Sequence, residues 1–427
     1  MSAEFSDSTT LLRLTQDEGH FTGGHVERMA EGVAHGAPSG IAAVRARVRL
    51  QSIDALRGLV IMLMALDHVR DYFTNTRFNA LDLAQTTVPI FFTRWITHFC
   101  APTFIFLAGV SAYLVSLHCT RAELRRFLLT RGLWLIFLEL TVISFAWAFG
   151  SVYSMGILLQ VMWVIGASMV IMAALVNLPI GVLATISVVM IAGHNLLDGY
   201  APAPGTATAV AWTFLHAKGL LVKEGVIPFF VSYPLIPWVG VMGLGYVAGQ
   251  LFEMHPARRG RMLLLGGVIA LVTFVVLRFS NVYGDPHKWV PSPDLVRSVL
   301  SFVNVEKYPP SLLYLLLTLG TAALLLAKLE TVKGKWLKVL QTFGRVPLFF
   351  YVLHIVLAHA AAGLLAMTMG YGTRVLNAIF PTLPRDWGFD LPVVYLAWIL
   401  VLLTLYPACR WFGEIKHRRR DWWLAYL

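Results

Sequence analysis

The sequence predicts an all-α integral membrane protein with about ten transmembrane helices and both termini in the cytoplasm. Of its 427 residues, 57% are hydrophobic and 13% are charged, and the mean hydropathy is +0.69. Soluble proteins carry about 25% charged residues. The apolar residues also form uninterrupted runs long enough to span a bilayer as helices, unlike the short alternating segments of a membrane β-barrel.

Two regions follow from the hydropathy along the chain. Residues 1–44 are polar and lack the apolar core of a signal peptide, so we expect a disordered cytoplasmic tail. Residues 45–427 are predicted to form one polytopic transmembrane domain. Its predicted spans are 53–74, 98–118, 130–149, 154–176, 179–196, 227–252, 262–279, 309–328, 346–369 and 391–411.

The basic residues predict the orientation. Lys and Arg are about twice as frequent at one set of span ends as at the other, and cytoplasmic loops carry such an excess. The net charge of +11 is therefore interpreted as a topology signal, and no nucleic-acid partner is expected. The basic ends lie at residues 45–49, 121–131, 258–261, 328–345 and 410–420.

The first predicted span carries charged residues, which are expensive in a membrane and usually functional. Arg57 and His68 are eleven residues apart, so at 100° per residue they lie on one helix face. A rise of 1.5 Å per residue separates them by roughly 16 Å along the axis. We therefore expect a fixed cation near the cytoplasmic surface and a titratable imidazole toward the outer one.

His68 is the candidate general base. Asp71 follows at i+3, where its carboxylate can orient the imidazole and stabilise the imidazolium, and Asp67 is the alternative partner. His98 opens the second span and is expected at the same depth as His68. The predicted catalytic residues are His68, Asp71 and His98.

Arg57 has two compatible interpretations. It can pair with Asp54 at i−3 and anchor the helix end, or it can hold the phosphates of an anionic ligand that enters from the cytoplasm. Arg345, at the start of the ninth span, is the second candidate for binding those phosphates.

The sixth span contains Pro228, Pro234 and Pro237, which predict a broken helix. Such a helix is either a kinked packing element or the wall of a cavity. Gly245 and Gly249 form a GxxxG pair that permits close helix approach. The residues expected to line the substrate cavity are Asp67, Tyr233, Trp238, Tyr351 and His354.

No metal site is predicted. His354 and His359 in the ninth span are five residues apart, which places them about 140° apart around a helix. The cysteines form no CxxC pair, and no HExxH motif occurs.

Five stretches carry a family resemblance: RLQSIDALRGLVIMLMALDHVRDYF, TRWITHFCAPTFIFLAGVSAYL, YPLIPWVGVMGLGY, FGRVPLFFYVLH and the terminal RRRDWWLAYL. They resemble a bacterial family that bears the heparan-alpha-glucosaminide N-acetyltransferase catalytic-domain name, over about residues 50–427. This family belongs to the transmembrane acyltransferase superfamily. The resemblance implies acyl-CoA on the cytoplasmic side and a glycan-type acceptor on the other.

Within that superfamily, the O-acyltransferase branch has an arginine, ten residues and then a histidine, a pattern similar to Arg57 and His68. The lysosomal N-acetyltransferase branch has an asparagine near the position of His68 and its active histidine in the loop after the first span. Here residues 72–97 contain no histidine. His98 falls where that branch has an acidic residue.

The sequence thus predicts a multi-pass acyltransferase of the bacterial inner membrane that moves an acyl group, most simply acetyl, from cytoplasmic acyl-CoA to a glycan or sugar-like acceptor at the outer side. The acceptor attacks the thioester directly, or an acyl-histidine forms first. Acetyl-CoA or another acyl-CoA is the co-substrate. Expected partners are membrane lipids and the acceptor, with a homodimer as a possible assembly. The alternatives are a proton-coupled transporter or flippase and a catalytically inactive scaffold.

Overall fold

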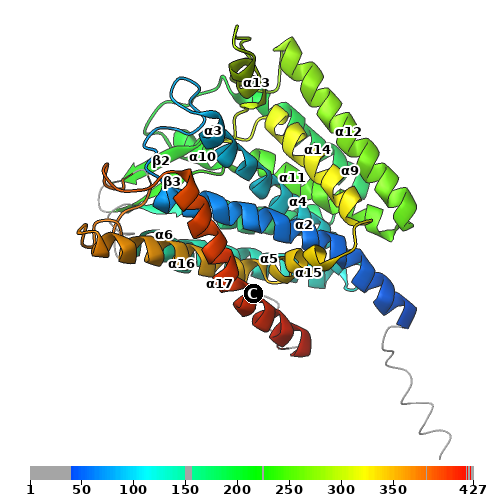
Figure 1. Cartoon of the computed structure of the whole chain (residues 1–427). Helices are drawn as coiled ribbons and strands as arrows, with labels where there is room; N and C mark the ends of the chain where they lie inside the picture. The colour runs from blue at the N-terminus through cyan, green and yellow to red at the C-terminus, as the bar shows by residue number, and fades with distance from the viewer. Residues whose placement is uncertain are drawn as a thin grey trace, which may run out of the picture. The chain divides into compact units, whose positions relative to one another are not determined.

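Long apolar helices account for most of the structure (Figure 1). It is a computed structural model that describes residues 40–149, 156–223, 226–380, 382–419, 421 and 424, without the side chains of 40–50, 223 and 226. The first helix begins at Gly40. Of the predicted disordered tail, residues 1–39 lie outside the described residues. Residues from Arg49 onward form one compact unit.

The elements up to residue 231 alternate long helices with short turns and three strands. They are α2 (Gly40–Phe73), α3 (Val88–Trp95), η1 (Ile96–Phe99), α4 (Cys100–Ser116), α5 (Arg121–Leu138), η2 (Glu139–Ile143), α6 (Ser144–Ala148), β1 (Ile157–Leu159), α8 (Val161–Leu175), α9 (Ile180–Gly193), η4 (His194–Leu197), α10 (Ala207–Leu215), β2 (Gly219–Lys223) and β3 (Val226–Val231).

The remaining described elements are helical. They are α11 (Leu235–Ala248), η5 (Gly249–Glu253), α12 (Pro256–Ser280), α13 (Leu295–Val303), α14 (Leu312–Leu329), α15 (Lys335–Gly344), α16 (Pro347–Thr368) and α17 (Leu391–Arg418).

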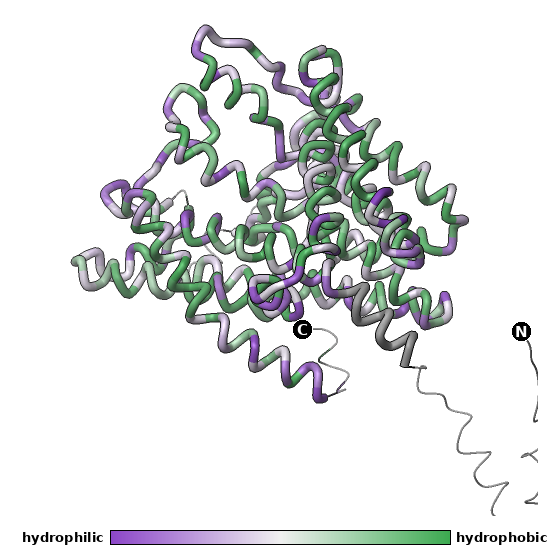
Figure 2. The backbone as a smooth tube through the Cα atoms, turned by 45° about the vertical axis from the view of Figure 1, so that its right-hand side comes forward, coloured by the Kyte–Doolittle hydropathy of each residue, from purple (hydrophilic) through white to green (hydrophobic). Residues whose placement is uncertain are grey.

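The all-α membrane class is confirmed. Every predicted span contains a helix, and within the described residues eight helical stretches are long and apolar enough to cross a membrane. Of the other two, α8 has 15 residues and α2 carries Asp and Arg along its length. Hydrophobic residues, in green, make up most of the helical segments in Figure 2. The number of spans and the side of the termini stay predictions.

The prediction of the sixth span is wrong for its first residues. Residues 226–231 form β3, which pairs in parallel with β1 and antiparallel with β2. β-Branched and aromatic residues favour a strand here. Pro234 immediately precedes α11, and Pro237 lies in its first turn, where a missing N–H costs no helical hydrogen bond. The prolines therefore precede the helix or lie in its first turn instead of breaking it, and one argument for a transporter is lost.

The GxxxG pair acts as predicted. A Cβ atom on Gly245 would lie 2.1 Å from the carbonyl oxygen of Phe106, and one on Gly249 would lie 2.4 Å from the Cβ of Tyr113. Phe106 and Tyr113 both belong to α4, against which α11 packs extensively. Only glycine permits this approach of the two backbones.

The C-terminal end of α2 is held by the segment that precedes α17. The indole nitrogen of Trp387 donates to the carbonyl of Tyr72 at 2.8 Å, and the backbone N–H of Phe389 donates to that of Phe73 at 2.7 Å. These bonds satisfy carbonyls that a helix end leaves without partners. The last turns of α2 are therefore fixed in place.

Candidate active site

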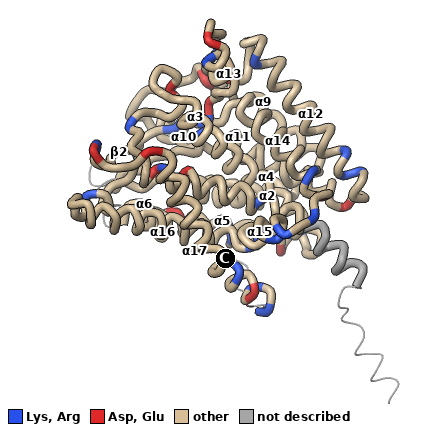
Figure 3. Tube along the Cα trace, viewed as in Figure 1, with Lys and Arg blue, Asp and Glu red and all other residues tan. Residues whose placement is uncertain are grey.

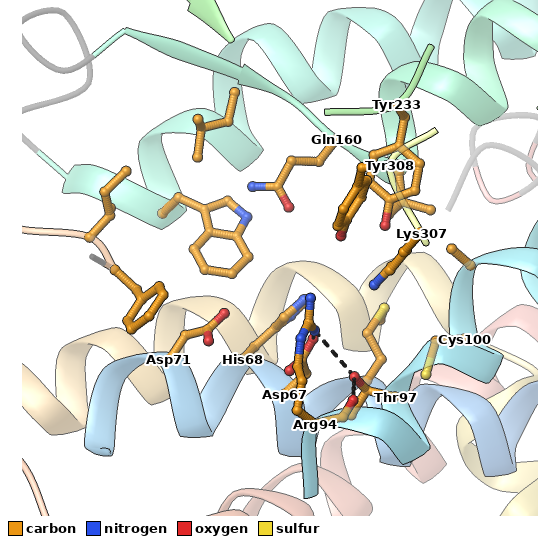
Figure 4. Close-up of a pocket in the computed structure, with 17 residues that line it drawn as sticks. Asp67, His68, Asp71, Arg94, Thr97, Cys100, Gln160, Tyr233, Lys307 and Tyr308 are labelled. Carbon is orange, nitrogen blue, oxygen red and sulfur yellow. Dashed lines mark hydrogen bonds and ion pairs between the residues drawn. The ribbon is translucent and has the colours of Figure 1, made fainter. Parts of the chain in front are cut away.

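His68 lies on α2 in the wall of a cavity of about 150 Å³, which we call the histidine cavity. In Figure 4, His68 and Asp71 rise from α2 on one side, and Gln160, Tyr233 and Tyr308 come from the other. The polar side chains that line the cavity are Asp67, His68, Asp71, Arg94, Thr97, Gln160, Tyr233, Lys307 and Tyr308.

A second histidine determines which ring nitrogen of His68 carries the proton. The Nδ1 atom of His68 lies 2.7 Å from the Nε2 atom of His354, and the Nδ1 atom of His354 lies 2.9 Å from the carbonyl oxygen of Phe350. Because a carbonyl only accepts, His354 carries its proton on Nδ1 and accepts through Nε2. His68 then donates through Nδ1, which leaves a lone pair on its Nε2. That is the atom a general base needs.

The ring of His68 is also held by packing. The Trp147 ring contacts it edge-on at 4.8 Å between centroids, and Tyr351 does so at 6.0 Å. His68 and His354 are almost fully buried. The imidazole is therefore oriented before any substrate arrives.

The expected contact between His68 and Asp71 is replaced by another pairing. Asp71 accepts a hydrogen bond from Arg70 at 2.6 Å, and His354 occupies the Nδ1 side of His68. Charge-assisted bonds to a guanidinium are stronger than neutral ones, which explains the choice of Asp71. Asp71 still lines the histidine cavity, so its catalytic role stays a prediction.

Asp67, the alternative partner, is part of an ion-pair cluster. Its carboxylate pairs with Arg94 and lies 3.1 Å from Arg70. The cluster compensates charges that would otherwise be costly at this depth. Asp67 therefore holds Arg94 at the histidine cavity and also pairs with Arg70.

Five polar lining residues were missed as site residues: Arg94, Thr97, Gln160, Lys307 and Tyr308. Arg94 stands in the apolar stretch that leads to His98. Because a charged side chain is costly in a membrane, its presence there could have identified Arg94 as a site residue. Lys307 and Tyr308 come from the loop before α14, and no spacing in the sequence links them to α2.

Tyr308 is placed to donate a proton or a hydrogen bond. Burial raises the pKa of Tyr308, but the cations of Lys307 and Arg94 outweigh burial, so the net shift is downward. The Lys307 ammonium lies 5.0 Å from the centre of the Tyr308 ring. A phenol acidified in this way is a better donor to a developing negative charge.

Glu139 fixes the opposite wall. Its buried carboxylate accepts from the backbone N–H groups of Gln160 and Trp163 at 3.2 and 3.1 Å. A carboxylate at a helix N-terminus satisfies free donors and matches the helix dipole. The start of α8 is thereby anchored, with Gln160 and Val161 at the cavity.

The other predicted residues lie beside the histidine cavity. His98 lines a neighbouring cavity that shares Arg94, Lys307 and Tyr308 with it, and neither ring nitrogen of His98 is hydrogen-bonded within the described residues. Trp238 is fully buried against Tyr233 and does not line the histidine cavity.

A second cavity, of about 290 Å³, lies along the same helix and is mainly apolar. Arg57 and Arg345 line it together with Arg131, Lys416 and Tyr351. Figure 3 shows Lys and Arg gathered around α15 and at the C-terminal end of α17. An apolar cavity with basic residues suits a ligand that has an apolar or neutral arm and an anionic head.

Arg57 pairs with Asp54 as expected, and its binding of phosphates stays a prediction. Its guanidinium donates to Asp54 at 3.0 Å, to Ser111 at 3.2 Å and to the carbonyl of Gly344 at 3.2 Å, while it lines the second cavity. Gly344 also permits α15 to touch α2, because a Cβ atom there would lie 1.8 Å from the carbonyl oxygen of Asp54. This contact brings the following Arg345 to the same cavity.

The two cavities share two lining residues, Met64 and Val161. Met64 stands on α2 between Arg57 and His68, as their common helix face predicts. A ligand in the second cavity is therefore one side-chain layer from the histidine cavity.

Membrane-length helices, an oriented, buried histidine in one cavity and a second cavity beside it define a multi-pass membrane protein with an enzyme-like site. Residues 49–277, more than half of the chain, match the family model described as heparan-alpha-glucosaminide N-acetyltransferase, catalytic. The chain belongs to this family, as the resemblance implied, and the family implies acetyltransferase chemistry. No curated protein is significantly similar to it. The matched range includes Arg57 and His68 and ends before His354.

Proposed function

We propose that the protein transfers an acetyl or other acyl group from cytoplasmic acyl-CoA to a glycan or sugar-like acceptor at the outer side of a bacterial inner membrane. The observation that supports this most is the order of groups along α2. Arg57 lines the second cavity, Met64 lines both cavities, and His68 lines the histidine cavity. An extended pantetheine arm can cover the roughly 16 Å that helix geometry puts between Arg57 and His68.

In the proposed reaction, Nε2 of His68 takes the proton of the acceptor hydroxyl or amine. The freed oxygen or nitrogen attacks the thioester carbonyl, the carbon–sulfur bond breaks, and the proton on His68 passes to the departing thiolate. Tyr308 and Lys307 offer donors to the negative charge that develops on the carbonyl oxygen. In the alternative route, Nε2 itself attacks and forms an acyl-histidine, which the acceptor then cleaves.

The lining of the histidine cavity supports a hydroxyl-rich acceptor. Carboxylate, amide, phenol and ammonium groups surround a small volume there. Such a mixture of donors and acceptors suits a sugar, whose hydroxyls do both.

The test is an assay of acyl transfer by the purified protein in lipid nanodiscs. Radiolabelled acetyl-CoA is mixed with panels of amino sugars and neutral sugars, and released CoA and labelled sugar are measured. We expect CoA release that depends on one class of sugar. Proton-coupled solute flux in proteoliposomes without CoA release would instead establish the transporter alternative.

A further inference from the structure

Three side chains with metal-binding atoms meet away from the histidine cavity. His194 begins η4 at the end of α9, Asp198 follows that turn, and His216 directly follows α10. One ligand atom from each lies within 4.8 Å of the other two. Nε2 of His216 and Oδ1 of Asp198 are already 3.1 Å apart.

His194 is buried without a normal hydrogen bond within the described residues. It is 1% exposed, and neither of its ring nitrogens makes a hydrogen bond of normal geometry within the described residues. The carbonyl of Pro310 interacts with it only outside that geometry. Nδ1 of the buried His216 likewise has no partner there. Unpaired buried polar nitrogens are costly, and a metal ion would satisfy one nitrogen of each ring.

We propose that His194, Asp198 and His216 bind a divalent transition-metal ion, Zn²⁺. Two imidazoles and one carboxylate suit zinc, whereas Mg²⁺ and Ca²⁺ prefer oxygen ligands alone. Tetrahedral zinc ligands at 2.0–2.1 Å from the metal lie about 3.3 Å from one another. Movements of about 1–1.5 Å in the ligand atoms would bring the present cluster to that ligand–ligand spacing.

An outer layer of contacts is already in place. Asn195 donates to Oδ2 of Asp198 at 2.8 Å and accepts from the backbone N–H of Leu312 at 2.9 Å. The Pro310 carbonyl is available to accept from the free N–H of a metal-bound His194. Ligating carboxylates and imidazoles normally have such partners. The ion would join the end of α9, the end of α10 and the start of α14.

The role inferred is structural. None of the three ligands lines the histidine cavity or the second cavity. These residues belong to no spaced motif in the sequence, and their proximity comes from the fold, so no metal site was predicted here. The proposal is independent of the proposed acyl transfer.

The experiment uses tag-free protein that has been stripped with a chelator and then titrated with CoCl₂ and ZnCl₂. We expect one equivalent of Co²⁺ to give d–d absorption bands between about 500 and 650 nm, Zn²⁺ to displace them, and the Tm to rise with Zn²⁺ but not with Mg²⁺. Asp198→Asn, which is nearly isosteric, and His216→Asn should weaken binding by more than the roughly 10–100-fold typical of outer-layer changes.

His118→Asn removes an exposed histidine and is the matched control, which should bind as wild type does. Wild-type protein without d–d bands would overturn the proposal. Equal binding by wild type and Asp198→Asn would overturn it as well, since the metal would then lie elsewhere. Asp198→Asn decides the question even if the histidine variants fail to fold.

Discussion

The Nδ1 atom of His68 and the Nε2 atom of His354 lie 2.7 Å apart, although 286 residues separate them in the chain. The bond joins α2 to α16 and sets the tautomer of the candidate base. His354 lies beyond the range that defines the family match. In the proposed mechanism, it is therefore a positioning residue contributed by the second half of the chain.

His68→Ala is expected to abolish acyl transfer. Loss of a general base typically costs roughly 10²–10⁴-fold in rate. The measurement is kcat/KM for acetyl-CoA at matched protein concentration. His359→Asn is the control, because His359 is equally buried and Asn can keep the hydrogen bond to the Ala146 carbonyl. Activity of His68→Ala within a few-fold of wild type would disprove the assignment.

The activity should rise with pH through one acidic limb, because only the neutral imidazole of His68 can accept a proton. The limb is measured in the pH profile of kcat/KM, which reports the free enzyme. The His359→Asn control should keep the same limb. A profile that is flat at acidic pH would exclude His68 as the base.

His354→Leu should lower kcat by roughly 10–100-fold, because a hydrogen bond to a charged group is worth about 1.5–3 kcal/mol. His354→Gln should restore most of that loss, since the Gln carbonyl oxygen can occupy the place of Nε2. The acidic limb of the pH profile should move in His354→Leu and return in His354→Gln. If both variants lose activity equally with unmoved profiles, His354 has a structural role only.

Arg57→Gln and Arg345→Gln should each weaken CoA binding about tenfold or more, because each removes a cation from the second cavity. Isothermal titration at two salt concentrations measures this, and salt should weaken wild-type binding more than that of the variants. Arg297→Gln, at an exposed surface ion pair, is the control. Unchanged affinity in both cavity variants would place CoA elsewhere.

Met64→Trp should fill the boundary between the two cavities. Transfer should fall by an order of magnitude or more, while CoA affinity stays within a few-fold of wild type. Leu133→Trp adds the same side chain on an exposed face of α5 and controls for it. Loss of CoA binding together with activity would mean that the cavity boundary is not at Met64.

We expect an alkaline limb in the pH profile of the activity, caused by ionisation of Tyr308. Because the cations of Lys307 and Arg94 outweigh burial and lower its pKa below the ordinary value of 10.0, its donor proton should be lost below pH 10. Activity should therefore fall with rising pH in that range, and Tyr308→Phe should have lower activity without this limb. A limb that persists in Tyr308→Phe would belong to another group.

Local geometry explains what the sequence could predict. The apolar runs locate the helices, and a regular helix alone puts Arg57, Met64 and His68 along one face. The GxxxG contact of α11 follows from its own small residues. These features depend on neighbours along one helix, so they can be read without knowledge of the fold.

The partners of His68 could not be read in this way. His354 was expected only to line the cavity, and Lys307 was not predicted as a site residue, because contacts between distant segments arise from tertiary packing. The expected pair of His68 and Asp71 satisfied the helix spacing but ignored the competing guanidinium of Arg70. The strand at 226–231 was read as helix because a short apolar run has no decisive periodicity.

The wall that Met64 and Val161 form between the two cavities has an electrical consequence. On the proposed function, CoA keeps its phosphates at the Arg57 end. The acyl group crosses the wall to the acceptor, while the acceptor's proton and one negative charge pass together to the CoA sulfur. Moving one elementary charge through 100 mV takes about 2.3 kcal/mol, but this exchange moves no net charge. The equilibrium of the transfer would then be independent of the membrane potential.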